Sequence, residues 1–253
     1  MSQYVIKNLS GGVGNQMFQY AAGRAAAQAL GGALVLLPAD NPHSKTDYRL
    51  ILFKGLQAAP LKPAMVYQQQ SGFEAWTPDR FVGYDVVRLQ GHFQNLPAIA
   101  PILPIVRDEF IEALAPLRAQ LKRKYNMTFT KRLAFIHIRR GDYLRQPTVH
   151  WTQPAEFYEK GVETLSTKPL HWYVLSDDIA WCKQQPWLQG KQFVDEPELV
   201  ALAFMSLCEG GAVISNSTFS WWGAILAGAP TVYPTKWYKD VKPDLFPSDW
   251  LRI

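Results

Sequence analysis

The stretch AVISNSTFSWWGAILAGAPTVY, residues 212–233, contains a strand, a turn, a helix and a second strand in sequence. Its short apolar runs, Ala212–Ile214 and Thr231–Tyr233, are typical of buried strands, and Trp221–Ala227 between them is a predicted helix. Strands joined through a helix normally lie parallel in one sheet. The polar run SNSTFS places hydroxyl and amide groups at the positive end of that helix, where an anion can bind.

The rest of the second half repeats this alternation of short apolar runs and helical segments. Strands are predicted at Leu133–Ile138, Leu170–Leu175 and Gln192–Val194, and helices at Pro154–Leu165, Ile179–Gln185 and Glu198–Cys208. This alternation is typical of an α/β domain in which helices wind around a parallel sheet.

The first half begins in the same way and then becomes irregular. The predicted elements are a strand at Tyr4–Leu9, a glycine-rich loop, a helix that Gly31 and Gly32 stop, and a strand at Ala33–Leu37. From Pro38 to Lys131 only a strand at Val86–Leu89 and a helix at Asp108–Tyr125, with Pro116 inside it, are predicted. We therefore expect two domains, 1–128 and 129–253, and the last residues can pack back on the first.

Composition limits the classes of function. The chain has 253 residues, a net charge of +5 and a pI of about 9.1, which suits a phosphate-bearing ligand, an anionic membrane face or plain solubility. Its basic residues are scattered, which argues against a nucleic-acid partner. The two cysteines form no metal or disulfide pattern. No secretory signal or membrane-spanning run is visible, so we expect a cytoplasmic location, with peripheral contact at the inner membrane face left open.

Three polar loops follow predicted strands of the second half. They are Arg139-Arg140-Gly141-Asp142, Ser176-Asp177-Asp178 and Asn216 to Ser220. Ligands of parallel sheets bind beyond the carboxyl ends of the strands, so we expect the three loops to face one crevice.

Each loop has a structural and a functional interpretation. Arg139 and Arg140 can grip a phosphate with a planar fork, or an arginine can pair with Asp142 and only hold the loop. Asn216, Ser217, Thr218 and Ser220 exceed the single residue that a helix cap needs, which favours a ligand. Asp177 and Asp178 can form a turn and cap or contact a ribose. Trp221 and Trp222 are expected to pack in the core. No Asp-x-Asp sequence occurs, so no metal site of that type is indicated.

The loop GGVGNQ, residues 11–16, is a weak signal alone. It lacks the third glycine of the dinucleotide fingerprint, because Met17 occupies that position, and it lacks the ending of a P-loop. Asn15 and Gln16 can cap the following helix or bind a sugar. Gly12 and Gly14 would let the backbone approach a ligand closely.

Six segments together resemble the α-1,2-fucosyltransferases of glycosyltransferase family 11. They are GGVGNQMFQYAAGRA (11–25), GHFQN (91–95), HIRRGDY (137–143), SDD (176–178), FMSLC (204–208) and SNSTFSWWGA (215–224). The resemblance implies a GT-B-like fold with two Rossmann-like halves. It also implies inverting transfer of L-fucose from GDP-β-L-fucose to the 2-hydroxyl of a terminal galactose, without a metal or other cofactor. The C-terminal half would bind GDP-fucose and the N-terminal half would help hold the galactose-terminated acceptor.

The resemblance also implies roles for residues. His137 would contact the nucleoside, Arg139 the diphosphate, and Arg140 and Asp142 would shape their loop; Ser217, Thr218, Phe219 and Ser220 would close over the phosphates, and Asn15 would lie near the diphosphate–fucose linkage. Ala201 stands where the family is expected to have a guanine-reading Asp, and Glu198, one helical turn earlier, is a substitute. The catalytic candidates are Arg139, Asn15 and Asp142, with Asp142 or the diphosphate itself accepting the acceptor's proton.

Three alternatives stay open at this point. One is a GDP-sugar-dependent glycosyltransferase that forms a different linkage. Another is a different nucleotide-using enzyme such as an oxidoreductase, against which the missing fingerprint counts. The third is a non-catalytic sugar- or nucleotide-binding module.

Overall fold

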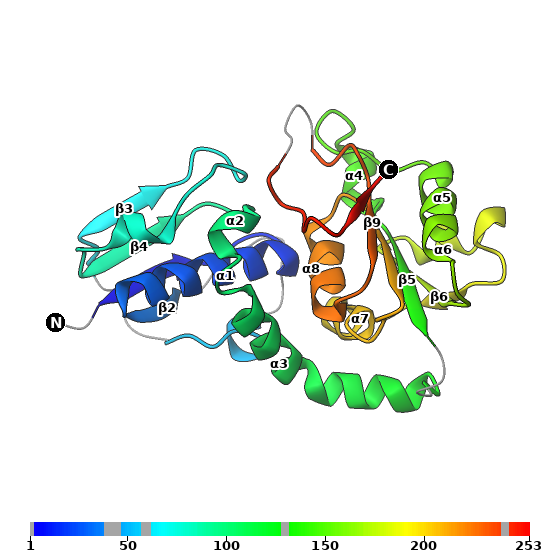
Figure 1. The fold of residues 1–253 in the computed structure, drawn as a ribbon, viewed down its shortest axis with the longest axis horizontal. Helices are drawn as coiled ribbons and strands as arrows, with labels where there is room; N and C mark the ends of the chain where they lie inside the picture. Colours follow the sequence, from blue (N-terminus) through cyan, green and yellow to red (C-terminus); the bar gives the residue numbers. More distant parts are fainter. Residues whose placement is uncertain (1–2, 38–46, 57–61, 128–131, 239–242) are drawn as a thin grey trace. The chain divides into compact units, whose positions relative to one another are not determined.

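A computed structural model describes residues 3–37, 47–56, 62–127, 132–238 and 243–253. The chain forms two compact units: unit 1 comprises residues 1–113 and 243–246, and unit 2 comprises residues 114–242 and 247–253. The predicted domain boundary, between residues 128 and 129, lies outside the described residues. Each unit has its own parallel sheet (Figure 1) and is described by itself.

Unit 1 contains a four-stranded sheet in the order β2-β1-β4-β3, in which every described pairing is parallel. Its strands are β1 (Tyr4–Asn8), β2 (Ala33–Leu37), β3 (Met65–Gln68) and β4 (Val86–Gln90). Its helices are α1 (Val13–Leu30), η1 (Tyr48–Leu50), η2 (Pro78–Phe81) and α2 (Leu96–Ile99), and α3 (Leu103–Lys124) contributes to both units. Gly31 ends α1 in the left-handed conformation, at φ 65°, which glycine adopts without steric strain.

The core of unit 1 joins apolar strands to a group of aromatic rings. Tyr67, Trp76 and Phe81 lie close to one another, and Phe93 contacts Tyr67 and Trp76. Lys7 on β1 lies against this group, with its side-chain nitrogen 5.9 Å from the centre of the Phe93 ring. A lysine is therefore part of this apolar interior.

Unit 2 contains a six-stranded sheet in the order β10-β9-β8-β5-β6-β7, also parallel throughout the described pairings. Its strands are β5 (Leu133–Ile138), β6 (His171–Ser176), β7 (Gln192–Val194), β8 (Gly211–Ile214), β9 (Thr231–Tyr233) and β10 (Leu251–Arg252). Its helices are α4 (Gly141–Arg145), α5 (Ala155–Leu165), α6 (Ile179–Cys182), η3 (Pro186–Leu188), α7 (Glu198–Met205) and α8 (Thr218–Ala227). Figure 1 shows α5 and α6 on one face of this sheet and α7 and α8 on the other.

The predicted strands and helices of unit 2 are present, although α6 ends at Cys182 and α7 at Met205, each three residues before the predicted end, and β10 was not predicted. Two further differences lie near the polar loops. Helix α8 begins at Thr218, earlier than the predicted Trp221, because the polar run itself forms the first turn. The predicted loop after β5 contains the start of the short helix α4. In unit 1, β3 was not predicted, since only one of its four residues is buried and its apolar pattern is short.

The strand order of unit 2 fixes where a ligand can bind. From β5 the chain builds outward through β6 and β7, and it then returns to build β8, β9 and β10 on the other side of β5. The order therefore reverses between β5 and β8. In parallel sheets, the crevice beyond the carboxyl ends of the strands at such a reversal is the usual ligand site.

Candidate functional site

The loops after β5 and β6 meet through an arginine between two carboxylates. The guanidinium of Arg139 lies 2.7 Å from an oxygen of Asp142 and 3.2 Å from an oxygen of Asp177. Gly141 makes this approach possible, because a Cβ there would lie 2.4 Å from Asp177 Oδ2. Two of the three polar loops that were predicted to face one crevice therefore contact each other.

Arg140 has a different environment from Arg139. Its backbone N–H donates to Asp177 at 2.9 Å, its Nε to Asp178 at 3.2 Å, and its guanidinium lies 3.5 Å from the centre of the Trp181 ring. The Arg140 side chain is 18% exposed and that of Arg139 31%. Stacking and pairing therefore hold Arg140 against the protein, while more of Arg139 faces solvent.

Asp178 has the capping function that was one of its two predicted interpretations. Its side chain accepts a hydrogen bond from the backbone N–H of Trp181 at 3.2 Å, and it is the N-cap of α6. A carboxylate at a helix N-terminus is favourable by itself. A further contact of Asp178 with a ribose stays a prediction.

His137 links β5 to the loop after β8. Its Nδ1 lies 3.0 Å from the Ser215 hydroxyl, and its ring is 5.4 Å from that of Phe219. Burial, with a smaller contribution from the charge of Arg139, lowers the pKa of His137 to about 3. The imidazole is therefore neutral near pH 7, and it can hydrogen-bond to a ligand but cannot supply positive charge to it.

Helix α8 presents its N-terminus at the carboxyl end of β8. Ser217 is the N-cap residue, and its side chain makes no capping hydrogen bond. The Ser220 hydroxyl donates back to the carbonyls of Ser215 and Ser217. The helix therefore keeps its positive end without a side-chain cap from Ser217, which is the arrangement that anion sites use. Thr218 and Phe219 form its first turn.

Asn216 is buried and connects three segments of unit 2. Its amide group donates to the carbonyl of Trp237 at 3.1 Å, its side-chain oxygen accepts from Gln153 at 3.1 Å, and its backbone carbonyl accepts from the Tyr143 hydroxyl at 2.8 Å. These bonds use both polar ends of the side chain. We therefore assign Asn216 the structural task of holding the loops, which its sequence position alone did not reveal.

Asn15 and its neighbours belong to unit 1. The N-cap of α1 is Gly12, and Asn15 lies within the first turn, so the interpretation of Asn15 as a helix cap is wrong. Its side-chain oxygen instead accepts a hydrogen bond from Gln94 at 3.1 Å, while Gln16 donates to the carbonyl of Gly11. The GGVGNQ and GHFQN segments thus meet through their amides. Gly14 is buried in the same turn.

Glu198 lies in the first turn of α7, and Ala201 lies buried one turn further on. Helix α7 starts after β7, so Glu198 is at the same sheet edge as the polar loops. Among the described residues no group of three His, Cys, Asp or Glu side chains could hold a metal ion. No described helix is both long and apolar enough to span a membrane.

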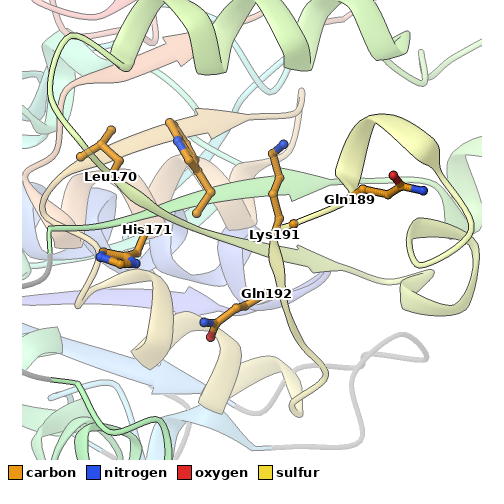
Figure 2. Close-up of a pocket in the computed structure, with 7 residues that line it drawn as sticks. Leu170, His171, Gln189, Lys191 and Gln192 are labelled. Atoms are coloured by element: carbon orange, nitrogen blue, oxygen red, sulfur yellow. The ribbon is translucent and has the colours of Figure 1, made fainter.

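A cavity of about 270 Å³ lies beside the amino ends of β6 and β7. Figure 2 shows its lining, in which Lys191 and Gln192 point to opposite sides of the backbone. Leu170 and His171 are at the amino end of β6, and Gly190 and Lys191 directly precede β7. The cavity is thus remote from the carboxyl-end loops and is separate from the candidate site.

Sequence reasoning missed the residues that surround these loops. Tyr143, His150 and Tyr238 form a chain of ring contacts beside Arg139, and Gln153 holds the segment to Asn216. Tyr143 lies within the HIRRGDY segment, which was the one available signal. The other three lie in irregular loops without a recognisable pattern.

The two parallel sheets and the polar strand reversal define a GT-B-like glycosyltransferase fold, as predicted. The structure is similar to POFUT1 solved in complex with GDP-fucose, with a TM-score of 0.61 and 14% identity, over 91% of this chain and 98% of that one. At that identity the likeness establishes the fold alone.

The chain belongs to glycosyl transferase family 11, whose family pattern matches residues 89–250. It is 25% identical to an α-1,2-colitosyltransferase of Escherichia coli, over 98% of each chain. It is also 27% identical to the mouse galactoside 2-α-L-fucosyltransferase Sec1, over 89% of this chain and 65% of the mouse protein. The family predicted from six sequence segments is therefore confirmed, and the protein is a glycosyltransferase.

Proposed function

We propose that this protein transfers L-fucose from GDP-β-L-fucose to the 2-hydroxyl of a terminal galactose, with inversion. The observation that carries the proposal is the position of Arg139, which follows β5 at the strand reversal, where α8 also presents its N-terminus. Together they supply fixed positive charge and helix-dipole donors for a diphosphate. The fucose and galactose assignments draw support from the α-1,2-fucosyltransferase among the relatives and from the GDP-fucose in POFUT1.

The reaction requires stabilisation of the leaving GDP. As the bond between the anomeric carbon and the diphosphate oxygen breaks, negative charge accumulates on the diphosphate. Asp142 and Asp177 hold the Arg139 guanidinium in place, and a guanidinium has five N–H donors, so bonds to these carboxylates do not use its full capacity. A charge fixed in advance stabilises the transition state without reorganisation.

The acceptor hydroxyl must also lose its proton as it attacks. Asp142 is a candidate to receive this proton, although one of its oxygens accepts a hydrogen bond from Arg139. The alternative is that the departing diphosphate receives the proton. Arg139 and the α8 N-terminus supply the charge that a metal provides in other transferases, so the proposed reaction needs no metal.

The similarity to one relative favours a second candidate for the sugar-nucleotide donor. The α-1,2-colitosyltransferase matches nearly the full length of this chain. Colitose is fucose without its 3-hydroxyl group, so GDP-colitose presents the same base, diphosphate and anomeric carbon. The two candidate functions therefore share the site and differ in whether a polar group recognises that hydroxyl.

The test is incubation of the purified protein with lactose and either GDP-fucose or GDP-colitose. Mass spectrometry detects transfer, and NMR of the product assigns the linkage. We expect a fucosyl product linked to the galactose 2-hydroxyl. For variants of Arg139, Arg123→Ala, which changes an exposed arginine of α3, is the control for non-specific loss of charge. Faster transfer from GDP-colitose would establish the second donor, another linkage would correct the acceptor position, and GDP binding without transfer from either donor would indicate a binding module.

A further inference from the structure

Unit 2 carries an exposed aromatic side chain, Tyr238, that is linked to Arg139 through the rings of His150 and Tyr143, and a second one, Trp151, that follows His150 in the chain. Trp151 and Tyr238 are each 37% exposed. We call Trp151, Tyr238 and the partly buried His150 the aromatic shelf. A series of side-chain contacts leads to this group of rings from Arg139, whose guanidinium lies 5.5 Å from the centre of the Tyr143 ring.

The aromatic shelf is ordered by specific contacts. The His150 ring stacks on Tyr143 with centroids 4.2 Å apart and planes 10° from parallel. The Tyr238 ring meets His150 edge-on at 5.9 Å, and the Lys236 ammonium lies 5.1 Å from the centre of the Trp151 ring. Rings held in this way lose little conformational entropy when a ligand covers them.

Two loops that form the shelf are also tied to the polar site. Gln153 donates to the side chain of Asn216 and to the carbonyl of Lys236, each at 3.1 Å. The Tyr143 hydroxyl donates to the carbonyl of Asn216, directly before the N-cap of α8. The aromatic rings therefore have a fixed position relative to the groups that would bind the diphosphate.

We propose that the aromatic shelf is a subsite for the sugar acceptor, contributed by unit 2. This inference rests on the proposed function. One face of a galactose ring presents C–H groups, which pack on aromatic rings, while its hydroxyl groups remain available to polar side chains. Trp151 and Tyr238 would stack on the acceptor, and Lys236 would hold the Trp151 ring.

The strand order favours the acceptor over the guanine base. The shelf residues Lys236 and Tyr238 follow β9, whereas Glu198, the candidate for reading guanine, follows β7. Three strands, β8, β5 and β6, separate β9 from β7. A donor whose diphosphate lies at β5 and β8 and whose base extends towards β7 directs its sugar, and hence the acceptor, towards β9.

The test compares two replacements of one ring. Trp151→Leu keeps apolar bulk and removes the aromatic face, whereas Trp151→Phe keeps a face. With lactose as acceptor, we expect the Leu variant to raise the acceptor KM on the order of tenfold and the Phe variant to stay much closer to the wild type. Tyr238→Leu and Tyr238→Phe repeat the comparison. Tyr84→Leu, an aromatic residue of unit 1 that is 39% exposed, is the matched control.

Calorimetric GDP affinity and melting temperature are measured for every variant. We expect both to match the wild type. Equal acceptor KM values in the Leu and Phe variants would overturn the proposal, and so would a loss of GDP affinity, which would place the base on the shelf. If the wild type transfers no fucose or colitose, the proposed function fails, and NMR of lactose binding in the presence of GDP still compares the Leu and Phe variants. Equal lactose binding would then reject the shelf.

Discussion

The two units place different chemistry at the carboxyl ends of their parallel sheets. In unit 2 the loops after β5 and β6 carry paired charges, with Arg139 between Asp142 and Asp177. In unit 1 the corresponding loops meet through neutral amides, with Gln94 donating to Asn15. Fixed charges suit a ligand on which charge develops, and amides suit a neutral, hydroxyl-rich one. The difference supports our proposal that unit 2 handles the nucleotide sugar.

The largest expected effect separates the two arginines of unit 2. Arg139→Lys should lower kcat by roughly a hundredfold or more, because an ammonium cannot make forked bonds to the diphosphate. Arg140→Lys should mainly lower the melting temperature and should change kcat much less than Arg139→Lys does, because Arg140 is stacked on Trp181 and paired with Asp178. Steady-state kinetics and thermal unfolding measure both variants. Near-normal kcat in Arg139→Lys would mean that unit 2 does not stabilise the leaving group through this residue.

The fold of unit 2 could be predicted because its sequence is consistent at each level. The strand LAFIHI is buried at all six positions, and Arg139 follows at its end, so the apolar run and the polar loop have separate positions along the chain. The convergence of the loops followed from the parallel sheet alone. The ion pairs of Arg139 with Asp142 and Asp177 could not be predicted in this way, because they depend on the close approach that Gly141 permits.

Unit 1 contains a buried amine that offers a second test. Lys7 is 2% exposed, its side-chain nitrogen donates to the carbonyl of Asn8, and burial lowers its pKa from 10.5 to about 7. Between pH 7 and 10.5 the unfolded chain therefore binds more protons at this site than the folded protein, so the contribution of Lys7 to stability becomes less unfavourable as the pH rises.

Lys7→Met should consequently raise the free energy of unfolding at pH 7, by on the order of 4 kcal/mol, and should flatten its rise between pH 7 and 9. Denaturant unfolding at several pH values measures both effects. Lys62→Met, which replaces an exposed lysine of unit 1, is the control. Burial and the charge of Lys7 lower the pKa of His92 below its ordinary value of 6.5. His92 therefore titrates below the interval from pH 7 to 9. A destabilised Lys7→Met protein would contradict the prediction and give the amine a structural role.

Lys7 also shows why unit 1 was harder to read. A lysine in a strand normally indicates a face exposed to water, whereas here β1 is covered on the side where Lys7 meets Phe93. The aromatic residues that pack with Phe93 come from β3, η2 and the segments beside them, where local periodicity is weak. Such tertiary contacts leave no regular pattern in the sequence. The interpretation of Asn15 as a cap was wrong for a related reason, since helix α1 begins earlier than its apolar spacing indicated.

A smaller effect is expected at Asn15 in unit 1. If its amide meets the donor or its sugar, Asn15→Ser and Asn15→Asp should both fold and turn over roughly tenfold more slowly, because each loses the amide donor. The Asp variant should be the slower one, since it brings negative charge towards the phosphates. Because Asn15 is not the N-cap, capping cannot explain a difference between the variants. Gln94→Leu, which removes the hydrogen-bond partner of Asn15, controls for the bond between the two amides. Full activity of both Asn15 variants would leave that bond as the residue's only assigned task.

The smallest expected effect concerns divalent metals. We expect kcat with GDP-fucose and lactose to be unchanged after dialysis against excess EDTA, because in the proposed mechanism Arg139 and the α8 N-terminus provide the positive charge for the diphosphate. The result also sharpens the comparison of the two units. If charge compensation belongs to unit 2 alone, Arg139→Ala should stay inactive when Mg²⁺ or Mn²⁺ is added, since neither unit offers a described group of three ligands for the ion. Loss of wild-type activity in EDTA with recovery on adding Mg²⁺ would reject metal independence. Rescue of Arg139→Ala by the metal alone would show that a diphosphate-bound cation can replace the arginine, so that the site requires the charge and not the forked geometry.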